Sequence, residues 1–150
     1  DKLRTVRWTM QAGPTGHEAV AHTADLAIRA WAPDLAGLIE QAADGMLGLM
    51  LGSRPRGNAS AEVVGEGRDA EELLVDCLRE TLALWTVDGR VPVSVAVVNI
   101  ADGRAVCEVD VIDGALGHEA PGQEIKAVTY HGVEVTRTGT GLEVTVVFDV

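Results

Sequence analysis

The spacing of apolar residues changes near Gly89, and this change constrains the fold more than any other feature of the chain. Before Gly89, two segments carry apolar residues three and four positions apart, which is the spacing of an amphipathic helix. After Gly89, apolar and polar residues alternate over most of the remaining sequence, as is typical of strands. A chain that combines these patterns predicts an α+β fold.

Both predicted helices have recognisable ends. The first has Asp34 as its N-cap and should run to about Leu51, where Gly52 stops it. The second begins after Asp69, because an Asp at the cap followed by a Glu three residues later forms a capping pattern. We expect Gly89 to close this second helix.

The remaining apolar segments predict strands. They are residues 18–31, 61–66, 91–100 and 105–112, with two or three more strands within 125–150. Asp102-Gly103 favours a hairpin between the third and fourth of these segments. We expect a single-domain, two-layer α+β sandwich, in which a mixed, largely antiparallel sheet carries two amphipathic helices on one face. Residues 17–150 would form this domain, and residues 1–16 a disordered or artificially added leader.

The charge of the chain limits its partners. The sequence has 23 acidic and 12 basic residues, which gives a formal net charge of -11. Such acidity works against direct binding to the phosphate backbone of a nucleic acid. We therefore expect a protein or a cation as the partner, without direct nucleic-acid binding.

The sequence also indicates the compartment. The longest apolar stretch, Val91 to Ile100, is about half the length that a membrane span needs. The segment before Pro14 lacks the apolar run of a signal peptide. We expect a cytoplasmic protein without membrane contact, in which Cys77 and Cys107 are reduced core thiols. No oligomeric state follows from the sequence.

A carboxylate inside an apolar strand is the first candidate site. Asp25 lies within the His-Thr-Ala-Asp-Leu-Ala-Ile stretch, where an ionised carboxylate requires a cation, hydrogen-bond donors or a raised pKa. Asp149 lies in the last predicted strand, and a C-terminal Val150 would add an α-carboxylate. Together, these oxygens suit a hard divalent cation. The alternative is two separate surface carboxylates, because nothing local makes the two strands neighbours.

Two histidines and a lysine are further candidates. His22 is either a ligand or proton donor, or a hydrogen-bonded structural residue in an apolar strand. The segment from Lys126 to His131 brings together one of the two lysines, the single tyrosine and a histidine. Its alternative interpretation is a turn whose polar residues face water.

Common catalytic motifs are missing from the sequence. It has no G-x-S-x-G, Walker A, G-x-G-x-x-G or H-E-x-x-H pattern. The glycine-rich segment 114–122 lacks a lysine and the spacing of a phosphate-binding loop. These absences work against the common nucleophilic and acid–base enzymes.

Three motifs in this order resemble the archease family. They are the stretch from His22 to Ile28, the stretch from Lys126 to His131, and the terminal Val-Phe-Asp-Val. The resemblance extends from about Glu18 to the last residue. It implies that Asp25 and Asp149 bind a divalent cation, calcium in the family, that Val150 adds oxygen ligands, and that Lys126 is the functional lysine.

The same resemblance implies a role and a partner. Archeases are activating cofactors of the RtcB-type RNA ligase, which joins RNA ends in tRNA splicing and RNA repair. The implied function is a non-catalytic, metal-binding cofactor that promotes guanylylation and multiple turnover of that ligase. His22, Lys126 and His131 would support the site or contact the partner.

Two other functions remain open at this point. One is a metal-dependent hydrolase of phosphate esters, with His22 or His131 as general base. It requires turnover by the isolated protein. The other is a general chaperone-like interaction module, which requires an exposed apolar patch and no dependence on Asp25.

Overall fold

The computed structural model describes residues 13–21, 25–113 and 122–150. The elements follow one another as β1 (Gly16–Ala21), β2 (Leu26–Ala32), α2 (Leu35–Leu51), β3 (Ala59–Glu66), α3 (Ala70–Thr86), β4 (Val91–Ala101), β5 (Arg104–Ile112), β6 (Ala127–Val128), β7 (Thr136–Arg137) and β8 (Leu142–Asp149). None of the helices in these ranges has the length and apolar character needed to cross a bilayer.

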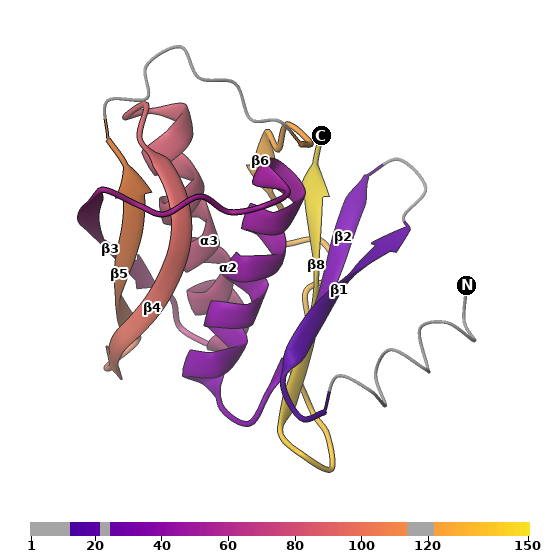
Figure 1. The fold of residues 1–150 in the computed structure, drawn as a ribbon. Helices are drawn as coiled ribbons and strands as arrows, with labels where there is room; N and C mark the ends of the chain where they lie inside the picture. Colours follow the sequence, from indigo (N-terminus) through magenta and orange to yellow (C-terminus); the bar gives the residue numbers. More distant parts are fainter. Residues whose placement is uncertain (1–12, 22–24, 114–121) are drawn as a thin grey trace.

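The strands form two sheets, and the two helices lie between them (Figure 1). One sheet has the order β1-β2-β8-β6, with β7 also paired to β8, and the other has the order β3-β5-β4. Every strand pair in the described ranges is antiparallel. The α+β class is confirmed, whereas the expected two-layer arrangement with one mixed sheet is replaced by a helical layer between two antiparallel sheets.

The composition of α2 explains this difference. Nine of its residues are buried, and they occupy more than one side of the helix: Leu38, Ile39, Ala42, Ala43, Gly45, Met46, Leu47, Met50 and Leu51. A helix that is apolar on several sides has to be covered on several sides. Accordingly, α2 packs against β2 of one sheet and β4 of the other.

Three of the four predicted helix ends are confirmed, whereas α3 ends at Thr86, with Val87 as its C-cap, three residues before Gly89. The Asp34 side chain accepts a hydrogen bond from the Gly37 N–H at 2.8 Å, and the Asp69 side chain accepts one from the Glu72 N–H at 2.8 Å. Each carboxylate satisfies a backbone donor that the first helical turn leaves unpaired. Gly52 ends α2 in a positive-φ conformation.

The predicted hairpin after Gly89 is also confirmed. Its turn consists of Asp102 and Gly103, with φ values of 53° and 72°. Two consecutive positive φ values define the turn that matches the twist of antiparallel strands, and Asp-Gly suits it. The turn thus sets the β4/β5 register, in which Ala101 lies opposite Arg104.

The prediction of one strand over residues 18–31 was wrong. This segment forms two antiparallel strands, β1 and β2, in which Gly16 lies opposite Trp31 and Ala21 opposite Leu26. Asp25 therefore lies in a bend just before β2 and outside any strand. The segment between the strands contains no Gly, Pro or Asn, and Asp25 is its one common turn residue, so its sequence gives only a weak turn signal.

Strand β8 is central in its sheet, and its two faces differ. Val144, Val146 and Phe148 are buried in the main core, with Phe148 0% exposed. Because side chains alternate along a strand, Val147 and Asp149 face away from the helices. This alternation agrees with the faces predicted from the sequence.

Candidate functional site

The pairing of β2 with β8 places the two aspartates predicted from the sequence at the same end of one sheet. In the β2/β8 pair, Leu26 lies opposite Phe148. Asp25 directly precedes Leu26, and Asp149 directly follows Phe148, so both aspartates lie at the same end of the β2/β8 pair. The two strands are thus neighbours, which the sequence alone did not establish.

The segment that contains Lys126 borders β8 on its other side. Ala127 lies opposite Asp149, and the backbone N–H of Lys126 donates to the carbonyl of Asp149 at 2.8 Å. The N–H of Thr129 donates to the carbonyl of Val147 at 3.1 Å. Three segments that are far apart in the sequence thus lie side by side at one end of the sheet (Figure 1).

The donor set suits a hard divalent cation. Two carboxylates supply at most four oxygens, whereas Ca²⁺ takes about six to eight oxygens from carboxylates, carbonyls and water. Among residues 13–21, 25–113 and 122–150, no three His, Cys, Asp or Glu side chains form a group that could hold a metal ion. A cation at Asp25 and Asp149 would therefore require further oxygen ligands, and Val150 remains the predicted source of one.

The other predicted site residues have different positions. Lys126 and Val150 are exposed at the same end of the sheet as Asp149. His131 is exposed in a turn with Gly132, and its backbone N–H donates to Thr129 Oγ1 at 3.3 Å. His131 thus lies in a turn that faces water, whereas Ala127 and Val128 of the same segment form β6, with Val128 1% exposed. His22 lies outside the described residues.

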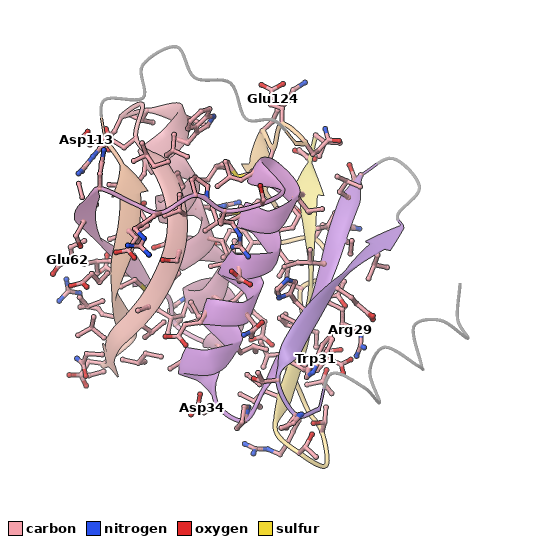
Figure 2. The ribbon with its side chains drawn as sticks, viewed as in Figure 1. Arg29, Trp31, Asp34, Glu62, Asp113 and Glu124 are labelled. Atoms are coloured by element: carbon pink, nitrogen blue, oxygen red, sulfur yellow. The ribbon has the colours of Figure 1, made fainter. Side chains whose placement is uncertain are left out.

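Sequence reasoning missed a charged cluster on the outer face of the same sheet. Arg29 Nε donates to Glu18 Oε1 at 2.8 Å, and Arg29 Nη1 donates to Glu143 Oε1 at 2.8 Å. The guanidinium carbon also lies 4.6 Å from the centroid of the Trp31 ring, and Figure 2 labels both side chains on β2. Arg29 therefore joins β1, β2 and β8. Asp25 directly precedes β2, and Asp149 ends β8. Only the β1/β2 pairing, which the sequence did not reveal, would have predicted this contact.

The two cysteines are buried free thiols in the core, as predicted. They lie next to each other, Cys77 on α3 and Cys107 on β5. A hydrogen bond with Cys107, together with burial, raises the pKa of the Cys77 thiol. This pair therefore has a packing role distant from the aspartates.

Comparison with known proteins agrees with the fold and with the motifs. The model of the Archease protein family matches residues 17–150. "Protein archease" of Methanosarcina barkeri is 33% identical over 141 residues, covering 89% of this chain and 95% of the relative. "Protein archease" of Danio rerio is 30% identical over 128 residues, covering 81% of this chain and 78% of the relative.

A solved structure shows the same architecture. The solution structure of Methanobacterium thermoautotrophicum protein 1598 has a TM-score of 0.67 and 25% identity, and the match covers 90% of this chain and 99% of that one. The fold is of the α+β class, with two helices between two antiparallel sheets (Figure 1). The chain belongs to the archease family. Membership in this family supports a cofactor-like role.

Proposed function

We propose that this protein is a non-catalytic cofactor of an RtcB-type RNA ligase, and that it promotes guanylylation and multiple turnover of the ligase in tRNA splicing and RNA repair. The observation that carries the proposal is the register of β2 and β8, in which Leu26, the residue after Asp25, lies opposite Phe148, the residue before Asp149. Family membership supports the cofactor role. The cytoplasmic location is part of the same proposal.

In this function, Asp25 and Asp149 would hold a divalent cation through their carboxylate oxygens. A bound cation would supply positive charge that attracts the phosphate groups of a nucleotide. Lys126 directly precedes β6, beside Asp149, and is exposed to solvent, so it would contact an anionic group of the ligase or its nucleotide. The acidity of the chain suits this division of roles, because the ligase would bind the RNA.

The test is multiple-turnover ligation by a purified RtcB-type ligase, with the protein added in small amounts. Asp25→Asn and Asp149→Asn remove a charge but keep the side-chain size, and each should abolish the stimulation. Lys126→Met should also lower it, and Lys126→Arg should retain more of it.

Glu62→Gln is the matched control. Glu62 is an exposed acid on β3 of the other sheet, as Figure 2 shows, so its neutralisation should leave stimulation unchanged. Unchanged multiple-turnover ligation with Asp25→Asn or Asp149→Asn would reject the proposal. Hydrolysis of a phosphate ester by the isolated protein would instead favour the hydrolase.

A further inference from the structure

A helix side chain anchors the short strand that borders the candidate site. Arg79 of α3 donates from Nε to the backbone carbonyl of Val128 at 3.0 Å. Its guanidinium carbon also lies 4.2 Å from the centroid of the Tyr130 ring, which is a cation–π contact. One side chain thus contacts two residues of the segment that follows Lys126.

A second side chain of α3 binds the far end of the same segment. Glu71 Oε2 accepts a hydrogen bond from the backbone N–H of Val135 at 2.8 Å. Glu71 and Arg79 are eight residues apart, so they lie on one side of α3 about 12 Å apart along its axis. The segment from Val128 to Val135 is therefore attached to α3 at both ends.

This attachment matters because the segment has little regular structure of its own. Strand β6 has only two residues, and residues 129–135 belong to no helix or strand. Segments with few backbone hydrogen bonds open more readily than core elements. In contrast, α3 is fixed in the core through Leu74 and Leu78, both 0% exposed.

We propose that Arg79 and Glu71 are positioning residues, which hold the segment from Lys126 to Val135 against β8 and thereby fix Lys126 beside Asp149 for the partner ligase. This inference rests on the proposed function. It assigns a role to α3, which carries none of the residues in the three motifs or the predicted site. Arg79 and Glu71 act through the segment and do not themselves reach Asp149.

Amide hydrogen exchange on the isolated protein tests the structural half of the proposal. Arg79→Met keeps a long side chain but removes the donor and the charge, and it should speed exchange of the Thr129 N–H about tenfold. Exchange of the Leu78 amide, inside α3, should not change. Equal acceleration at Leu78 would mean general destabilisation, and unchanged exchange at Thr129 would mean no anchoring. Either result would overturn the proposal.

Two pairs of variants serve as matched controls. Glu71→Ala removes the acceptor of the Val135 N–H and should speed its exchange, whereas Glu71→Gln keeps an oxygen acceptor and should have little effect. Tyr130→Leu removes the ring beneath Arg79, whereas Tyr130→Phe keeps it. If each conservative variant behaved like its disruptive counterpart, the contacts would not be the cause and the proposal would fail.

Ligation tests the functional half. Arg79→Met should raise the concentration of protein needed for half-maximal stimulation about tenfold, with the maximal rate retained, and Arg79→Lys should recover part of the loss. Faster exchange with an unchanged half-maximal concentration would reject the positioning role. Asp149→Asn in the same assay separates the two proposals, because full stimulation by that variant would reject the cofactor function itself.

Discussion

The Arg29 cluster provides a quantitative test of how the sheet with the two aspartates is held together. In the structure, Arg29 donates to two carboxylates, Glu18 and Glu143, each at 2.8 Å, and stacks on Trp31. The side chains of Arg29 and Glu18 are 16% and 13% exposed, whereas that of Glu143 is 36% exposed. We therefore expect Arg29→Met to destabilise the protein, mainly by leaving Glu18 unpaired in a largely buried position.

The magnitude follows from these contacts. A hydrogen bond to a charged group contributes about 1.5 to 3 kcal/mol when buried, and the more exposed Glu143 contact contributes about 0.5 to 1 kcal/mol. The cation–π contact adds about 0.5 to 1 kcal/mol. After allowance for the apolar packing that Met retains, the free energy of unfolding should fall by about 3 kcal/mol. For a chain of this size, Tm should fall by about 6 to 12 °C.

The assay is urea denaturation followed by circular dichroism, arranged as a double-mutant cycle. Arg29→Met, Glu18→Gln and the double variant should give a coupling energy of about 1.5 kcal/mol, because Glu18→Gln removes the charge that Arg29 neutralises. A loss below about 1 kcal/mol for Arg29→Met, or a coupling within about 0.3 kcal/mol of zero, would refute this reasoning.

Three further predictions concern other parts of the fold. Gly103→Ala should lower the free energy of unfolding by about 1 to 2 kcal/mol in the same denaturation assay. The reason is that Gly103 has a φ of +72° and an added Cβ would lie 2.8 Å from a backbone carbonyl oxygen. An unchanged free energy of unfolding would contradict this account of the turn. The pKa of Glu72 is lowered to about 2 by its hydrogen bond with the Arg68 side chain, so this pairing stabilises the fold above the unfolded pKa of about 4.3 and is lost as the pH falls toward 2. NMR titration of the Glu72 carboxyl should show this low value, and Arg68→Ala should raise it; a midpoint that Arg68→Ala leaves unchanged would rule out the assigned cause. The thiols of Cys77 and Cys107 should react with dithionitrobenzoate at pH 8 only after unfolding, because both are buried and the pKa of Cys77 is raised. Rapid labelling of the native protein would contradict the burial of these thiols.

The features predicted correctly from the sequence are those set by neighbouring residues. Asp34 and Asp69 cap helices through contacts three residues away, and Asp102-Gly103 specifies its own turn. The faces of β8 follow from strict alternation. Such local signals do not depend on where the rest of the chain lies.

The features that were missed depend on contacts between distant segments. The β1/β2 hairpin was missed because no Gly, Pro or Asn separates the strands and Asp25 alone does not specify a turn. The division into two sheets was missed because an apolar helix does not show how many sheets cover it. The candidate site was predicted in part. Asp25 and Asp149 were named from the sequence, but only the β2/β8 pairing shows that both lie at the same end of the sheet. Arg79 has no signal of its own, since a charged residue on a helix is ordinarily solvated.

The most direct test of the central claim is the transfer of GMP from GTP to an RtcB-type ligase, measured as labelled ligase over time with the protein added in small amounts. The wild-type protein and the Glu62→Gln control should accelerate labelling equally. Asp149→Asn should reduce labelling to the rate of the ligase alone, because one of the two carboxylates proposed to hold the cation is lost. Acceleration by Asp149→Asn equal to that of the wild type would contradict a role for the end of β8 in activating the ligase.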